Sequence, residues 1–223
     1  MQYIFLLSKP RSGSTLFRLL LGQLKNVVSL PETHFFVFHK QNKSLDFSGN
    51  KEKIVDRWLK FYTIRKFKID KTALRKHLLT TTNSWRDLFE ETVNFYLKSR
   101  QKVNVSFVIE KSPPHIFFQK EIDKMFQDAE KLFLVRDPRS VIASSLTMSW
   151  STHNVLTLAR GWKKAIGTVD PDNFIKYEDL VDQNPNIINF LESKFDLHID
   201  KENFFSVMPD QHEEGKHSQQ NTH

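Results

Sequence analysis

Short apolar runs alternate with longer amphipathic stretches along this chain, and that alternation limits the fold more than any other feature. The apolar runs predict strands at 3–7, 27–30, 106–109, 132–135 and 173–177. Helical patterns fall at 14–24, 54–67, 74–79, 85–97, 116–126, 140–148, 155–166 and 186–195. Because such alternation is typical of a parallel sheet covered on both faces, we expect an α/β three-layer sandwich with a central parallel sheet. The polar stretch 39–53 predicts a surface excursion.

Length and composition narrow the class of protein further. A chain of 223 residues suits one domain, and we predict a single domain over 1–223. The absence of cysteine excludes disulfides and thiolate zinc sites. With 6 glycines, the chain also lacks a glycine-rich dinucleotide loop. The net charge of +7 favours an anionic partner, although solubility alone also explains such a charge.

The hydropathy pattern argues against a membrane segment. The first apolar run has about five residues, too few for a signal sequence or a membrane span. We therefore expect a cytoplasmic protein without stable membrane insertion.

The polar segment 8–15 joins the first predicted strand to the first predicted helix. Backbone N–H groups and the positive end of the helix dipole make such a position an anion site. Gly13 lets the backbone approach the anion closely, and Arg11 adds a permanent positive charge. Hydroxyl donors come from Ser12, Ser14 and Thr15. The alternative is an ordinary strand–turn–helix connection.

This segment differs from the phosphate loop of kinases and nucleotide hydrolases. Gly13 occupies the second glycine position of that loop, but Ser14 stands where the loop has its lysine. Only Asp137 could serve as the metal-binding acid of such an enzyme, and it follows an arginine. A P-loop nucleotide kinase or hydrolase is therefore the second hypothesis.

A second candidate anion site follows the strand at 132–135. Arg136 comes at the end of this strand, and Ser144 lies eight residues later on the next predicted helix. That spacing lets both side chains face one phosphate, with the arginine making paired, charge-assisted bonds. A local ion pair between Arg136 and Asp137 is the alternative.

Together these two segments resemble a known enzyme family. Residues 10–16 resemble the 5′-phosphosulfate loop of sulfotransferases that use 3′-phosphoadenosine 5′-phosphosulfate (PAPS), and residues 132–144 resemble the family's 3′-phosphate motif. The resemblance implies a P-loop-NTPase-like sulfotransferase fold. It is closer to the branch of tyrosylprotein, carbohydrate and bacterial enzymes than to the cytosolic small-molecule branch, whose first loop carries a lysine where this chain has Arg11.

Three further segments resemble the same branch. Residues 31–34 look like the segment with the catalytic acid, which would be Glu32. Residues 110–113 look like the segment with the catalytic lysine, which would be Lys111, and Tyr177 falls in a late motif near the adenosine.

The resemblance implies metal-independent, in-line transfer of a sulfuryl group to an acceptor hydroxyl. Arg11 and the loop amides would hold the phosphosulfate, and Lys111 would neutralise the leaving oxygen. Glu32 is the preferred general base, with His34 and His115 as rivals.

The sequence is also compatible with other hypotheses about individual residues and about the function. Trp162 or a phenylalanine could stack on adenine, although a core position suits Trp162 better. A non-catalytic RNA-binding module is a third hypothesis, but most phenylalanines fall in core-like positions, so we expect no nucleic-acid partner. The tail histidines, at 212, 217 and 223, lack partner acids and do not predict a metal site. We expect the acceptor to be a small-molecule, sugar, lipid or peptide hydroxyl, and the sequence leaves these alternatives open.

Overall fold

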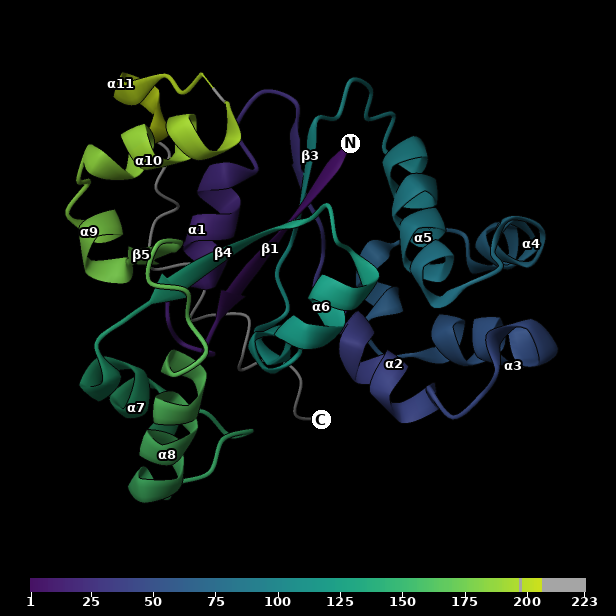
Figure 1. Ribbon diagram of the computed structural model, residues 1–223, viewed down its shortest axis with the longest axis horizontal. Helices are drawn as coiled ribbons and strands as arrows, with labels where there is room; N and C mark the ends of the chain where they lie inside the picture. The colour runs from purple at the N-terminus through teal and green to yellow at the C-terminus, as the bar shows by residue number, and fades with distance from the viewer. Residues whose placement is uncertain (197, 206–223) are drawn as a thin grey trace, which may run out of the picture.

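A five-stranded sheet forms the centre of the molecule, as the computed structural model shows for residues 1–196 and 198–205 (Figure 1). All neighbouring strands run parallel, in the order β2-β3-β1-β4-β5. The strands are β1 (Gln2–Ser8), β2 (Val27–Ser29), β3 (Phe107–Glu110), β4 (Glu130–Val135) and β5 (Phe174–Lys176). The predicted parallel sheet is confirmed.

Helices connect the strands and cover both faces of the sheet. The longer ones are α1 (Ser14–Leu21), α2 (Phe35–Asn42), α3 (Phe47–Lys60), α4 (Lys71–Thr81), α5 (Trp85–Ser99), α7 (Pro138–Leu146), α8 (Val155–Ile166) and α10 (Asn186–Phe195). The shorter ones are α6 (Gln119–Met125), α9 (Tyr177–Val181), α11 (Lys201–Phe204) and the 3₁₀ helices η1 (Ile64–Phe67) and η2 (Pro113–Phe117).

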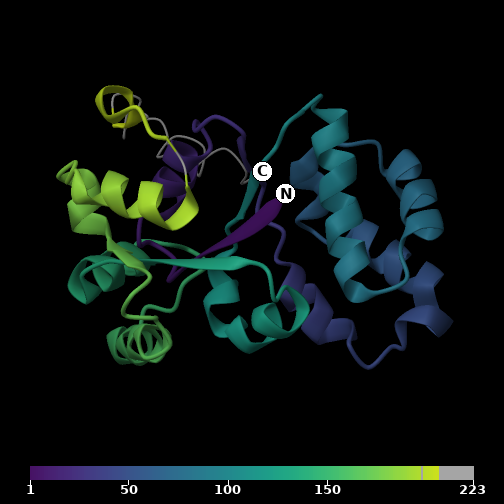
Figure 2. The ribbon, with the colours of Figure 1, turned by 45° about the horizontal axis from the view of Figure 1, so that its top comes forward.

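The central strand β1 divides the hydrophobic core into two halves. Because side chains alternate across a strand, Tyr3, Phe5 and Leu7 face the side packed by α2 to α6. Ile4 and Leu6 face the other side, where α1 and α10 cover the sheet. Figures 1 and 2 show these two groups of helices on opposite sides of the strands. The three-layer α/β sandwich is therefore confirmed.

Parallel strands bring their carboxyl ends to one edge of the sheet, and this edge carries the candidate site. β1 ends at Ser8, β2 at Ser29, β3 at Glu110, β4 at Val135 and β5 at Lys176. Ligands of open parallel sheets bind at this edge. The segments selected from the sequence all follow one of these ends.

Residues 39–53 lie largely at the surface, as predicted, but α2 and α3 occupy most of this range, so it is not an irregular loop. The polar residues mask a buried aromatic face: Phe38 and Phe47 are 2% and 6% exposed, and Trp58 further along α3 is fully buried. α3 is also kinked at Asn50, which has a non-helical backbone. The predicted helix 54–67 correspondingly ends at Lys60, and η1 follows.

No helix in the two described stretches is both long and apolar enough to span a bilayer.

Candidate active site

The loop between β1 and α1 has the backbone geometry of an anion-binding turn. Arg11 and Gly13 both have left-handed φ angles, of 70° and 84°. α1 then begins without a capping side chain and without an acidic residue in its first turn. The amide groups at this helix start therefore face a position that suits an anion.

Gly13 is required here by space as well as by backbone angle. A Cβ atom at this position would lie 2.2 Å from two ring carbons of Tyr177. Tyr177 begins α9 just after β5, so the late motif packs directly on the first loop. This is a cradle that only glycine can form.

Arg136 completes this contact from the end of β4. Its guanidinium lies 4.2 Å from the centre of the Tyr177 ring, within cation–π range. Its Nη1 donates to the carbonyl of Arg11 at 3.1 Å, and its own carbonyl accepts from Trp162 Nε1 at 3.3 Å. Trp162 is partly buried and braces this strand end.

Ser144 joins the same group through Arg11. The Nε of Arg11 donates to Ser144 Oγ at 2.9 Å, which links the first loop to α7. The spacing of Arg136 and Ser144 predicted that these two residues share a phosphate. The structure brings both of them against Arg11, so two guanidinium groups and a hydroxyl gather at one place.

Lys111 and Glu32 form the centre of a second group. Lys111 follows β3, and its side chain is only 4% exposed. Its Nζ lies 2.5 Å from Glu32 Oε1 and 3.3 Å from Thr15 Oγ1. The predicted catalytic lysine, the predicted acid and a hydroxyl of the first loop are thus in contact.

Basic side chains also lie near the other oxygen of Glu32. Oε2 lies 3.1 Å from Lys66 Nζ and 3.5 Å from His34 Nε2. Burial raises the pKa of this carboxyl, whereas hydrogen bonding to His34 and the charges of Lys111 and Lys66 lower it. The lowering wins, and the pKa of Glu32 falls well below its ordinary value. The carboxylate is ionised at neutral pH.

A buried carboxylate, Glu110, holds the segment that carries Glu32. One oxygen of Glu110 accepts from the Thr33 amide at 3.3 Å, from Thr33 Oγ1 at 2.7 Å and from Ser112 Oγ at 2.6 Å. Ser112 Oγ in turn accepts from the amide of His34 at 2.9 Å. The two residues that directly follow Glu32 are therefore fixed to the end of β3.

His115 lies inside this network rather than at the anion site. It is fully buried, and its Nδ1 lies 2.7 Å from the second oxygen of Glu110. Its Nε2 accepts from the Phe36 amide at 3.3 Å, so Nε2 carries no proton and Nδ1 donates to the carboxylate. The structure does not bring His115 to the surface that Lys111 and Glu32 share.

His34, the other rival base, is closer to Glu32 but is also engaged. It has a left-handed φ of 50° at the start of α2. Its Nδ1 contacts the Tyr62 hydroxyl, which comes from the segment after α3. His34 thus lies against Oε2 of Glu32, the carboxylate oxygen that does not contact Lys111, and helps to orient it.

Asp137 does not behave as a metal-binding acid. It accepts from the amide and the guanidinium of Arg139 and caps α7. Hydrogen bonding from the Arg139 side chain lowers the pKa of this carboxyl to about 2. Residues 1–196 and 198–205 contain no cluster of three or more histidine or acidic residues that could bind a metal ion. The tail histidines lie outside the described residues.

Sequence reasoning missed Glu110, Thr33 and Lys66. The signal for Glu110 was present, because an acidic residue ends an otherwise apolar strand. No sequence pattern pointed to Lys66, because it lies on η1 and two helices, α2 and α3, separate it from Glu32 along the chain.

The chain is similar to known proteins in its sequence and in its fold. Residues 3–201 match a sequence family described as the sulfotransferase family. No curated protein sequence matches the chain. The crystal structure of sulfotransferase STF9 from Mycobacterium avium is similar, with 17% sequence identity and a TM-score of 0.51. The matched region covers 93% of this chain and 68% of the STF9 chain. For sulfotransferase STF1 from Mycobacterium tuberculosis the sequence identity is 13% and the TM-score is 0.47. The matched region covers 92% of this chain and 71% of the STF1 chain. The likeness to STF9 supports the fold.

Proposed function

Because this chain belongs to the sulfotransferase family, we propose that it transfers the sulfuryl group of PAPS to an acceptor hydroxyl. Sulfuryl transfer is the activity of the family; the donor and the residue roles are our assignment. The contact of Lys111 with both Glu32 and Thr15 carries the proposal, because it joins a base, a cation and the anion loop at one point. The family match over 3–201 supports a single domain. The cytoplasmic location stays a prediction.

The first loop and the end of β4 suit a nucleotide with two anionic ends. We assign the phosphosulfate to the start of α1, where the amides and hydroxyls of Ser12, Gly13, Ser14 and Thr15 are placed. The 3′-phosphate is assigned to Arg136 and Ser144, with Arg11 between the two groups. The fit rests on the glycine cradle under Tyr177 and on the uncapped helix start.

Glu32 and Lys111 then divide the chemistry between them. In the proposed step the acceptor oxygen forms a bond to sulfur, and the bond from sulfur to the bridging oxygen breaks. Glu32 takes the proton of the acceptor hydroxyl, and Lys111 neutralises the charge on the departing phosphate oxygen. Lys111 now pairs with Glu32 at 2.5 Å, so its movement toward the phosphate would also make Glu32 a stronger base. A kinase-like reaction is not favoured, because Asp137 is committed to Arg139.

Binding of adenosine 3′,5′-bisphosphate tests the donor assignment. We expect calorimetry to detect binding to the unmodified protein and a large loss in Arg136→Ala. Arg139→Ala is the matched control, since Arg139 lies three residues further along, in the first turn of α7, with its side chain 90% exposed. Absence of binding to the unmodified protein would contradict the proposal.

The base assignment needs a separate variant. Glu32→Gln is expected to abolish transfer of label from PAPS while it leaves bisphosphate binding nearly intact. Glu52→Gln, an exposed carboxylate on α3, is the control. Full activity of Glu32→Gln would instead favour His34 as the base.

A further inference from the structure

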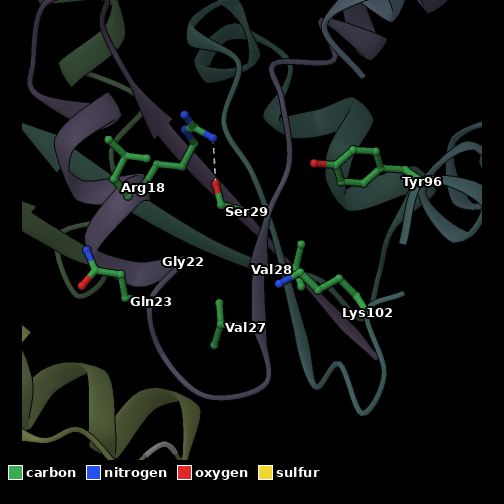
Figure 3. A pocket seen from close by; sticks show the side chains of 9 residues that line it. Arg18, Gly22, Gln23, Val27, Val28, Ser29, Tyr96 and Lys102 are labelled. Carbon is green, nitrogen blue, oxygen red and sulfur yellow. Dashed lines mark hydrogen bonds between the residues drawn. The ribbon is translucent and has the colours of Figure 1, made fainter. Parts of the chain in front are cut away.

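Two adjoining hollows lead away from the catalytic pair along the edge of the sheet. The first, of about 380 Å³, is lined by Thr15, Glu32 and Lys111 together with Lys66. The second, of about 440 Å³, lies between α1, β2 and the end of α5 (Figure 3). Arg18, Ser29 and Tyr96 line both hollows. Because they share these residues, the two hollows adjoin, and we call them together the β2 groove.

The β2 groove is built on a firm floor. Arg18 Nη1 donates to Ser29 Oγ at 2.9 Å and to the Leu30 carbonyl at 3.0 Å, which fastens α1 to the edge strand. Tyr96 packs edge-on against buried Phe67 at 5.2 Å. Figure 3 shows Arg18, Ser29, Tyr96 and Lys102 gathered around the groove. α1, β2 and α5 supply part of the wall, and Lys102 belongs to the segment between α5 and β3.

The charge of the groove is strongly one-sided. Among the residues that line the two hollows, Glu32 is the acidic one, and it is already surrounded by Lys111, Lys66 and His34. Arg18 lies midway, and exposed Lys102 stands at the end remote from Glu32. A negatively charged molecule is favoured along this path, and a positively charged one is disfavoured.

The size of the groove also limits the size of the molecule that can bind in it. Two hollows of this volume suit a small molecule of about disaccharide size, since ligand sites typically enclose roughly 300–1,000 Å³. Val27, Val28 and Leu19 supply apolar wall between the polar groups. This mixture suits a compound with an apolar or sugar-like body and charge at one end.

We propose that the acceptor is a small, elongated, anionic hydroxyl compound that lies in the β2 groove. Its hydroxyl faces Glu32 and Lys111, and its carboxylate or phosphate lies at the end marked by Lys102. This inference rests on the proposed function, because it takes Glu32 and Lys111 as the reacting end. It adds a chemical class of acceptor and makes Lys102 a specificity-determining residue.

Matched compounds that differ only in charge test the proposal. The probes are 4-nitrophenyl β-D-glucuronide against 4-nitrophenyl β-D-glucoside, and glucose 6-phosphate against glucose. Binding to the protein saturated with adenosine 3′,5′-bisphosphate is measured by ligand-observed NMR. We expect at least one anionic member to bind about tenfold more tightly than its neutral partner, as one favourable charged contact provides.

Lys102→Glu is expected to remove this preference and leave bisphosphate binding unchanged. Lys120→Glu, a charge reversal of an exposed lysine on α6, is expected to retain it. Equal binding of charged and neutral partners, no binding of any probe, or an unchanged preference in Lys102→Glu would overturn the inference. Failure of the bisphosphate itself to bind would instead refute the proposed function, so the two failures are distinguishable.

Discussion

Replacing Gly13 with alanine tests the contact on which the anion loop depends. The φ angle of 84° costs a non-glycine residue about 1–2 kcal/mol. In addition, the new Cβ would lie 2.2 Å from two ring carbons of Tyr177, so the ring must move by more than 1 Å to reach ordinary contact near 3.4 Å. That movement also weakens the cation–π contact with Arg136, which is worth about 0.5–2 kcal/mol. We expect Gly13→Ala to lower the free energy of unfolding by about 2–4 kcal/mol.

A double-mutant cycle separates the backbone cost from the collision. In a Tyr177→Ala background the ring is absent, so Gly13→Ala should cost only the backbone share, about 1–2 kcal/mol. Urea unfolding of the four proteins provides the free energies, and calorimetry with adenosine 3′,5′-bisphosphate provides the affinities. We expect Gly13→Ala alone to weaken nucleotide binding as well, because the displaced ring borders the loop.

The same loss in both backgrounds would refute the reasoning, since it would mean that the ring does not restrict this position. A loss below about 1 kcal/mol in the single variant would also contradict it, because even the backbone angle alone costs that much.

Three further outcomes are expected. Glu110→Gln should destabilise the protein at neutral pH by about 1.5–3 kcal/mol, as loss of charged hydrogen bonds does. Burial raises the pKa of Glu110 and hydrogen bonding lowers it, and the net effect is a lowering. The contribution of Glu110 to the free energy of unfolding is therefore present above its unfolded pKa and is lost as the pH falls through its folded pKa. Urea unfolding should accordingly show that the stability of the variant is less sensitive to acid than that of the unmodified protein. Lys66→Ala removes one cation that lowers the pKa of Glu32. The acid limb of the kcat profile, which reports the substrate-bound state, should therefore move to higher pH. An unmoved limb would argue against Glu32 as the base. Thr92→Val leaves the buried Trp58 indole N–H without its acceptor at 2.9 Å and should cost about 1–3 kcal/mol in the same unfolding assay.

The architecture was largely readable from the sequence because its signals are local. Each predicted strand is a short apolar run, and the structure places a strand within or overlapping every one of them. The end of each strand then determines which residues lie at the ligand edge, since all strands run the same way. That reasoning placed Arg11 and Arg136 at one edge of the sheet, whereas Tyr177 was selected through the family resemblance.

The details that failed depend on contacts between distant segments. The polar range 39–53 concealed helices because their stability comes from phenylalanines packed against Trp58, not from their own composition. The contact between Arg11 and Ser144 joins residues more than a hundred positions apart, and spacing within one motif could not predict it. Glu110 likewise works through Thr33, which a linear pattern does not connect with it.

The central place of β1 has a consequence for how the molecule is assembled. Both neighbours of this strand are made much later: Tyr3 pairs with Val108, and Ile4 pairs with Glu130. During synthesis the first strand must therefore wait, with both edges open, until most of the chain has left the ribosome. Long-range parallel pairing is slow, and an apolar strand with free edges is prone to aggregation meanwhile. We therefore expect the anion loop, which directly follows this strand, to form late in folding.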